Sequence, residues 1–221
     1  MAYPYAADSL EQQPFIYYLE QYVYADPREI SSRMKIPYYD SIGAFRVRFL
    51  ERLYEVTYPE FSVRHLEERE GPFPLEENTY AKILLLRYLL EGDQSDFSGN
   101  MLAYRDLPWG DTYYPTFQRL CVQRLARQYG SYPEAFCRAM DHLYGVPMSF
   151  GDYSYQFELF HGLYLCFILW QGDEEYPPNA QILFSDNFPM AFTAEDAAQA
   201  VDLVLDYMQA YQARKKGDKI G

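Results

Sequence analysis

The stretch that decides the fold class runs from residue 151 to residue 170: Gly151-Asp152-Tyr153-Ser154-Tyr155-Gln156-Phe157-Glu158-Leu159-Phe160-His161-Gly162, followed by the apolar run Leu163 to Trp170. Its first part alternates apolar and polar residues, which predicts a strand with one buried face. His161 and Gly162 predict a turn, and the apolar run predicts a central strand that is buried on both faces. A third strand expected at Gln181 to Phe184 completes a three-stranded antiparallel meander.

The first half of the chain has the same order of elements. Phe45, Val47 and Phe49 alternate with Arg46 and Arg48, so a strand is expected there. Short strands at Leu53 to Thr57 and Phe61 to His65 complete a second meander. Two helices are expected before each meander and one after it: Phe15 to Tyr24, Arg28 to Met34 and Tyr80 to Leu90, then Pro115 to Gly130, a helix opened by Ser131 to Glu134, and Thr193 to about Tyr211.

These patterns predict an α+β fold, in which antiparallel β-meanders pack against α-helices in a single domain spanning residues 1–221. The shared order also suggests two similar ααβββα halves, residues 10–95 and 104–213, with a frayed tail at 214–221. Either an ancient duplication or a coincidence of common elements explains the similarity. In the helix after Pro115, one buried face is expected to hold Phe117, Leu120, Cys121, Leu125 and Tyr129.

Composition excludes several classes of protein. A chain of 221 residues with 49% hydrophobic content can bury a sizeable core. The longest apolar run has eight residues, whereas a membrane-spanning helix needs about 20. The N-terminus has no signal-peptide pattern, so a cytoplasmic protein without membrane association is expected. A net charge of -13 makes nucleic acid an improbable partner, because phosphate backbones are themselves negative.

Charge is distributed unevenly along the chain. Between Asp141 and Ala213 there is no Lys or Arg, although acidic residues are frequent. The simplest interpretation is a solvated surface. A surface for a cation, a metal or an Arg-rich partner is the sharper alternative. An intramolecular partner is also available, since several arginines lie upstream: Arg46, Arg48, Arg52, Arg119, Arg124 and Arg127.

The most unusual local motif is Trp170-Gln171-Gly172-Asp173-Glu174-Glu175. A buried strand here delivers three consecutive carboxylates to a turn, where they could serve as acid and base or bind a cation. Neighbouring strand residues point to opposite faces, so one or two of the three are expected to matter. A solvated hairpin turn is the alternative. The spacing does not match a calcium-binding loop, and no metal is expected.

A second candidate site is the loop that holds Arg105, Trp109 and Tyr113. The planar guanidinium of Arg105 suits a carboxylate or phosphate ligand. The favoured alternative is an ion pair with Asp152, Asp173 or Glu174, because a partly buried arginine is normally paired. Both interpretations place this loop close to the carboxylate turn.

Established catalytic and metal motifs do not fit the remaining residues. The three cysteines form no close pair, and no two histidines have the i, i+4 spacing of a helical zinc site. Ser32 to Lys35 and Ser185 to Asn187 match two penicillin-binding signatures, but no Lys-Thr-Gly strand follows. No cofactor is therefore expected. The 24 tyrosines fit ordinary packing better than a special interface.

Two stretches carry a family resemblance. The first is Tyr104-Arg105-Asp106-Leu107-Pro108-Trp109-Gly110, followed by Tyr113 and Phe117. The second is Gly151-Asp152, followed by Leu169-Trp170-Gln171-Gly172-Asp173-Glu174-Glu175-Tyr176-Pro177, Ile182-Leu183-Phe184 and Glu195-Asp196. Together they resemble a bacterial and archaeal family known as domain of unknown function 3786.

The resemblance covers most of residues 104–196, and the order of elements is compatible with the family back to about residue 40. It implies a common fold but no activity. The chain departs from the pattern at His161, where a proline is usual, and at Ser185, where the acidic residue is displaced to Asp186. Some members carry an iron–sulfur cysteine motif that this chain lacks.

Two functions remain in view. The leading hypothesis is a non-enzymatic domain that binds a small molecule or a protein through the Arg105–Tyr113 loop and the Trp170–Glu175 turn. The alternative is an enzyme for a small molecule, with Asp173 or Glu174 as acid and base and Arg105 holding an anionic group near Asp152. An enzyme needs a concave, water-excluding pocket, whereas an interaction domain needs an exposed patch.

Overall fold

The computed structural model describes residues 6–50, 52–68 and 72–217. Helices and strands alternate in groups along the chain, as an α+β fold requires. The first half contains α1 (Ala6–Tyr24), α2 (Pro27–Met34), β1 (Tyr38–Tyr39), β2 (Ala44–Phe49), β3 (Arg52–Thr57), β4 (Val63–His65), α3 (Pro74–Glu77) and α4 (Thr79–Glu91). The second half contains β5 (Met101–Ala103), η1 (Tyr104–Asp106), α5 (Gly110–Phe117), the π-helical turn η2 (Gln118–Val122), α6 (Gln123–Tyr129), α7 (Pro133–His142), β6 (Val146–Pro147), β7 (Tyr153–Phe160), β8 (Leu163–Trp170), β9 (Asn179–Ser185), η3 (Phe188–Met190) and α8 (Ala194–Gly217).

The strands of the described residues form one antiparallel sheet in the order β4-β3-β2-β7-β8-β9-β5, with β1 beside β2 and β6 beside β7. Both predicted meanders are present, β2-β3-β4 and β7-β8-β9. Their first strands meet, because Phe49 of β2 pairs with Phe160 of β7 and Leu50 N donates to Leu159 O over 2.8 Å. The two meanders therefore share a single sheet.

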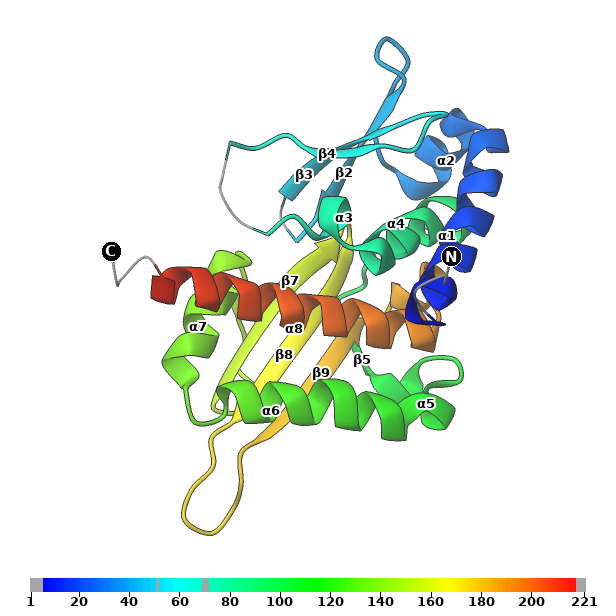
Figure 1. The fold of residues 1–221 in the computed structure, drawn as a ribbon. Helices are drawn as coiled ribbons and strands as arrows, with labels where there is room; N and C mark the ends of the chain where they lie inside the picture. Colours follow the sequence, from blue (N-terminus) through cyan, green and yellow to red (C-terminus); the bar gives the residue numbers. More distant parts are fainter. Residues whose placement is uncertain (1–5, 51, 69–71, 218–221) are drawn as a thin grey trace.

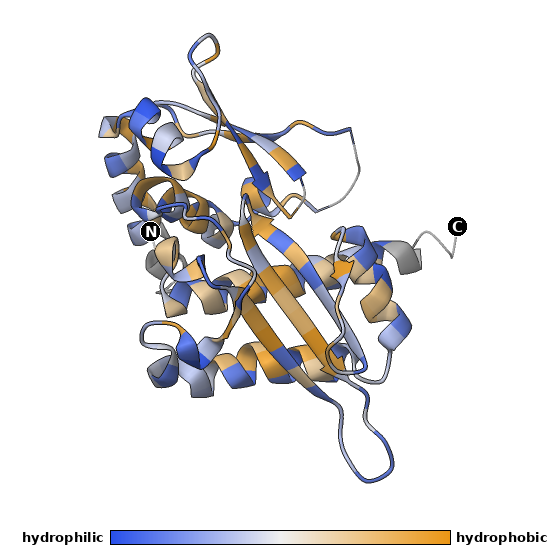
Figure 2. Ribbon diagram, turned by 180° about the vertical axis from the view of Figure 1, so that it is seen from behind, coloured by the Kyte–Doolittle hydropathy of each residue, from blue (hydrophilic) through white to orange (hydrophobic). Residues whose placement is uncertain are grey.

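Helices α6 and α8 run side by side across one face of the β7–β9 region, and α4 and α1 lie beside the first meander (Figure 1). Seen from the opposite side, β8 and β9 are the most apolar part of the ribbon (Figure 2). All residues of β8 are buried except Tyr164 and Trp170, which are partly exposed. This confirms the prediction of a central strand, since both of its faces are covered.

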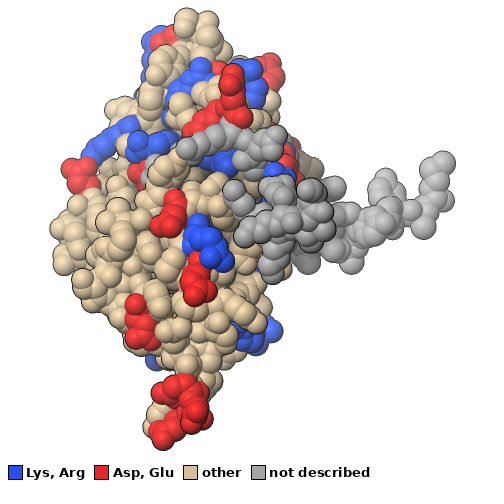
Figure 3. Space-filling view, turned by 90° about the vertical axis from the view of Figure 1, so that its left-hand side faces the viewer, with Lys and Arg blue, Asp and Glu red and all other residues tan. Residues whose placement is uncertain are grey.

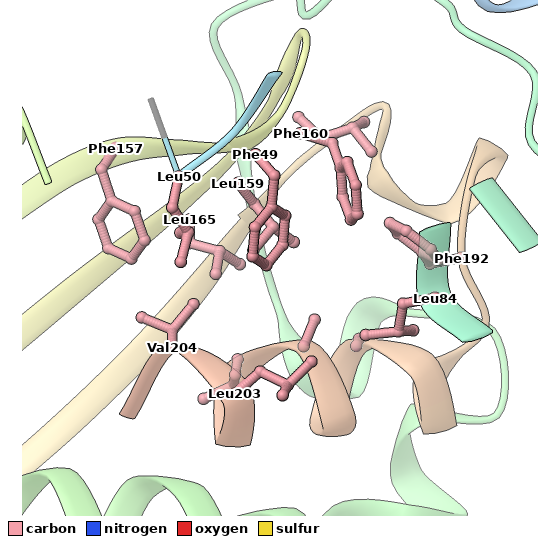
Figure 4. Packing of buried hydrophobic residues seen from close by; sticks show 14 of the residues in the cluster. Phe49, Leu50, Leu84, Phe157, Leu159, Phe160, Leu165, Phe192, Leu203 and Val204 are labelled. Atoms are coloured by element: carbon pink, nitrogen blue, oxygen red, sulfur yellow. The ribbon is translucent and has the colours of Figure 1, made fainter. Parts of the chain in front are cut away.

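The core is continuous across the junction of the two meanders (Figure 4). Phe49 and Phe160 lie with ring centres 4.8 Å apart, and Phe160 also contacts Tyr88 of α4 and Phe192. Leu203 and Val204 of α8 approach the same cluster from the helix layer (Figure 4). Burial of such large aromatic side chains supplies most of the stability of the fold.

One predicted helix start is confirmed in atomic detail. Thr193 N donates to Asp196 Oδ2 over 3.0 Å, and Asp196 N donates to Thr193 Oγ1 over 3.3 Å. This reciprocal pair satisfies two of the free N–H groups at the start of α8. Asp196 is buried and also accepts from Arg87 Nη1 at 2.6 Å, so the cap links α8 to α4.

Several boundaries were predicted wrongly. Pro115 does not begin a helix but lies inside α5, which begins at Gly110. The π-helical turn adds a residue to one turn and rotates Leu120 outward, so Leu120 is 45% exposed instead of buried. Ser131 does not cap α7; Tyr132 precedes that helix without a side-chain cap. Helix α8 continues to Gly217, so residues 214–217 are helical, and 218–221 lie outside the described residues.

Many acidic groups of the second half have intramolecular partners. Arg48 pairs with Glu158 at 2.9 Å and Arg87 with Asp196 at 2.6 Å. Arg124 pairs with two carboxylates of α8, those of Asp202 and Asp206. Part of the anionic region is therefore neutralised inside the protein. Within the described ranges, no helix is both long enough and apolar enough to span a bilayer.

Candidate functional site

The carboxylate turn lies in the β8–β9 hairpin, which projects beyond the edge of the helix layer (Figure 1). Asp173 Oδ1 accepts from the backbone N–H groups of Glu175 and Tyr176, at 2.8 and 2.7 Å. Asp173 N in turn donates to Tyr176 O over 2.9 Å. Asp173 therefore shapes the loop, as aspartates commonly do in turns.

Asp152 anchors the base of the same hairpin. Its Oδ2 accepts from Gln171 N over 2.8 Å, and its own N–H donates to Leu169 O over 3.1 Å. The chain between Phe150 and Tyr153 thus holds the end of β8 in place. Asp152 thus lies at the base of the turn, and its contact there is with the backbone.

An open groove of about 480 Å³ lies at the base of the hairpin. Its lining combines aromatic, prolyl and amide side chains: Trp170, Gln171, Tyr176, Pro177, Pro178 and Asn179. The Tyr176 side chain is 68% exposed. Large rings at the mouth of an open groove provide apolar contact area at small entropic cost, since each has only two side-chain torsions.

Pro178, one of the lining residues, packs closely against two glycines that leave room for its ring. A Cβ on Gly172 would lie 2.7 Å from Pro178 Cδ, and a Cβ on Gly130 would overlap the Pro178 ring. Gly130 follows the end of α6. The base of the hairpin is therefore fixed against the end of that helix.

Electrostatically, the turn is an exposed anionic site. The two backbone N–H donors from Tyr176 and Glu175 lower the pKa of Asp173 below its usual value. Glu174 and Glu175 are exposed, and none of the ion pairs formed among the described residues includes them. In Figure 3, acidic side chains gather at the protruding end of the molecule.

The Arg105 loop is built differently. Tyr104 anchors it by donating to Ala194 O over 2.8 Å and by stacking on Phe117 at 3.8 Å. Arg105 lies flat over the ring of Tyr114, with its guanidinium carbon 3.9 Å from the ring centre. It also approaches Asp111 at 3.8 Å, and both side chains are well exposed.

Trp109 projects from this loop into solvent. Its backbone is left-handed, with φ of 66°, and its side chain is 78% exposed. The turn requires glycine at the next position, because a Cβ on Gly110 would overlap Tyr104 O. A strained, exposed tryptophan is unusual in a protein surface. Tyr113, one turn further on, is 43% exposed.

The two candidate regions do not form one surface, contrary to the sequence-based prediction. They lie at opposite ends of the helical run α5-η2-α6, which begins after Trp109 and ends at Gly130 beside Pro178. At 1.5 Å per residue such a run is about 30 Å long. The ion pair expected between Arg105 and Asp152, Asp173 or Glu174 is therefore not formed, and Arg105 pairs with Asp111.

The sequence matches a known protein family over most of its length. Residues 26–207 match DUF3786, a domain of unknown function. The chain belongs to the DUF3786 family. The match in this DUF3786 protein spans both meanders and most of α8. Comparisons with curated proteins and with solved structures found no match.

Sequence reasoning missed some residues of this DUF3786 groove. Tyr176, Pro177, Pro178 and Asn179 also line the groove, but the predicted site ended at Glu175, and Tyr176 and Pro177 entered only through the family resemblance. The sequence did contain a signal for these groove residues, since an aromatic residue and two prolines directly follow the charged turn. Among the described residues, no cluster of three or more His, Cys, Asp or Glu side chains has metal-binding geometry.

Proposed function

We propose that this domain is a non-enzymatic protein-binding module, which holds a Lys- or Arg-bearing segment of a partner in the groove at the base of the β8–β9 hairpin. The observation that carries the proposal is an open aromatic groove beside two exposed carboxylates, Glu174 and Glu175, which form no ion pair within the described part of the chain. Aromatic side chains favour interfaces, and complementary charge selects the partner.

Charge supports a cationic partner over an anionic one. The stretch from Asp141 to Ala213 contains no Lys or Arg. Glu174 and Glu175 therefore have no lysine or arginine near them in the sequence that could neutralise them. Asp173 is ionised at neutral pH, as an ordinary aspartate is, and its lowered pKa keeps it ionised further into acid. A segment that carries Lys or Arg can therefore pair with the turn while its apolar residues contact Trp170 and Tyr176.

The alternative of an enzyme built on Arg105 with Asp173 or Glu174 is less well supported. Arg105 lies at the far end of the α5-η2-α6 run and pairs with Asp111. A general acid at neutral pH needs a raised pKa, whereas that of Asp173 is lowered. Both regions are exposed, which suits binding better than water-excluding catalysis.

A fluorescence titration tests the proposal. The chain has two tryptophans, so Trp109→Phe leaves Trp170 as a single reporter inside the groove. This protein is titrated with a peptide containing Lys, Arg and an aromatic residue, and with a counterpart in which Glu replaces each basic residue. We expect a saturable change in Trp170 emission with the basic peptide alone, and a large loss of affinity in Tyr176→Ala.

A matched control separates groove binding from general attraction to an acidic protein. Glu174→Gln with Glu175→Gln removes two negative charges at the hairpin, and Glu29→Gln with Glu60→Gln removes two exposed ones near α2 and the β3–β4 turn, at the other end of the molecule (Figure 1). We expect the hairpin pair alone to weaken binding. Equal weakening by both pairs, or no emission change with the basic peptide, would refute the proposal.

A further inference from the structure

A buried arginine lies far from the hairpin, on the interior face of β3. Arg52 is 4% exposed, and its side chain shares one face of the strand with Tyr54 and Val56, which are fully buried. Its Nε donates to Tyr207 Oη over 3.1 Å, and its guanidinium carbon lies 5.0 Å from the ring centre of Phe73. Arginine is rarely buried unless a carboxylate accompanies it.

Among the residues that the structure describes, no carboxylate forms an ion pair or a hydrogen bond with Arg52, although Glu67 and Glu76 lie close enough to act electrostatically on Tyr54. Glu76 of α3 pairs instead with His65, whose Nδ1 lies 2.8 Å from Glu76 Oε1. Glu67 accepts from Leu53 N. The Nη1 of Arg52 is fully covered and has no hydrogen-bond acceptor in the part of the chain that the structure describes.

A second orphan donor lies next to Arg52. The Tyr54 side chain is 0% exposed, and its hydroxyl has no partner in the described part of the chain. The two residues are two apart on one strand, so their Cβ atoms are about 7 Å apart on the same face. Burial raises the pKa of Tyr54, and the charge of Arg52 opposes that rise. The hydroxyl therefore remains a donor at neutral pH.

Residues from both halves of the fold lie around Arg52 and Tyr54. Tyr207 of α8 accepts from Arg52 and also bonds to His142 Nε2 of α7 over 3.1 Å. His142 stacks on Tyr211 at 3.9 Å. Arg52 and Tyr54 come from the first meander, whereas Tyr207 and His142 come from helices of the second half.

A buried donor without an acceptor is costly, and native proteins satisfy nearly all such groups. Two neighbouring orphan donors, one of them charged, call for a shared anionic acceptor. We propose that Arg52 and Tyr54 form an internal binding site for a small organic acid, whose carboxylate accepts from Arg52 Nη1 and Tyr54 Oη together.

The carboxylate is favoured for its shape and charge. Its two oxygens can accept from two donors at once, and its plane matches the guanidinium fork. Since both donors are fully covered, the ligand has few heavy atoms, and its entry needs a local shift of the covering side chains. The site neutralises Arg52 and joins the two halves of the core.

Thermal unfolding tests the site in the full chain. Melting temperature is measured with formate, acetate or propionate and compared with chloride at equal ionic strength, in a buffer free of carboxylate and phosphate. We expect a saturable rise with at least one carboxylate, because a ligand that binds only the native state stabilises it. Arg64→Gln, which removes an exposed arginine from the neighbouring strand, should respond like the native protein.

Tyr54→Phe is the decisive variant because it keeps the aromatic packing. Without ligand, it should melt higher than the native protein, since an unpartnered buried hydroxyl is removed. With ligand, it should lose most of the carboxylate-dependent rise, as should Arg52→Gln. A native protein that responds to no carboxylate beyond chloride would overturn the proposal, as would a response to phosphate or sulfate alone or an unchanged response in Tyr54→Phe.

Discussion

Polar groups have opposite surroundings at the β8–β9 hairpin and at the Arg52 cluster, which consists of Arg52, Tyr54, Tyr207 and His142. At the hairpin, Asp173 is satisfied by the backbone of its own loop, and the remaining carboxylates face water. At Arg52, the charge is buried, and one of its nitrogens lacks an acceptor among the described residues. Exposed charge costs little and is free to meet a partner, whereas buried charge needs a partner for the fold itself.

Tyr207→Phe gives the largest expected effect. The Tyr207 hydroxyl bonds to both Arg52 Nε and His142 Nε2, so its removal leaves Arg52 with a second buried nitrogen unpaired. We expect the free energy of unfolding to fall by about 1.5–3 kcal/mol, the range for hydrogen bonds to charged groups. Urea denaturation followed by circular dichroism measures this change.

Tyr54→Phe serves as the control for Tyr207→Phe, because each variant removes one buried phenolic hydroxyl near the same arginine. The two changes should shift stability in opposite directions. A similar loss in both variants would mean that the Tyr54 hydroxyl has a partner, and the contrast between the hairpin and the Arg52 cluster would disappear.

A smaller effect is expected from acid at the hairpin. The folded-state pKa of Asp173 is lowered by the N–H groups of Tyr176 and Glu175, so ionised Asp173 stabilises the fold above its unfolded-state pKa of about 4. This contribution disappears as pH falls through the lowered folded value. Asp173→Asn keeps an acceptor oxygen but does not titrate.

Melting temperatures measured from neutral to acidic pH should therefore differ between native protein and Asp173→Asn at neutral pH and converge in acid. The difference should be modest, because the site is exposed to solvent. Parallel profiles at all pH values would show that the backbone hydrogen bonds of Asp173 do not depend on its charge.

Much of the fold was predictable because it follows from local patterns. The alternation at Tyr153 to Leu159 and the apolar run after Gly162 identified β7 and β8, and Thr193 with Asp196 marked the start of α8. Pairing of the two meanders through Phe49 and Phe160 was not predictable, since it depends on contacts between distant segments. The π-helical turn that exposes Leu120 also has no simple sequence signal.

The candidate sites were predicted less completely than the fold. Asp152, Asp173 and Trp170 do lie at one hairpin, because they are close in a predicted strand pair. The position of Arg105 was not predicted, because it depends on the length of the helical run α5-η2-α6. This run begins at Gly110 and not at Pro115 as predicted. The buried position of Arg52 was not predicted, because Arg52 was named only as one of several arginines available to the acidic region. Its signal existed: Arg52 alternates in phase with the inward-facing Tyr54 and Val56, where a charged residue is unusual.

One double variant tests most directly the central claim that the hairpin carboxylates serve a partner and not the fold. Urea unfolding and binding of the basic peptide are measured together for Glu174→Gln with Glu175→Gln. We predict that the midpoint of unfolding stays unchanged while the affinity falls several-fold and loses much of its dependence on salt. A lowered midpoint with unchanged affinity would contradict this account and make the carboxylates part of the fold.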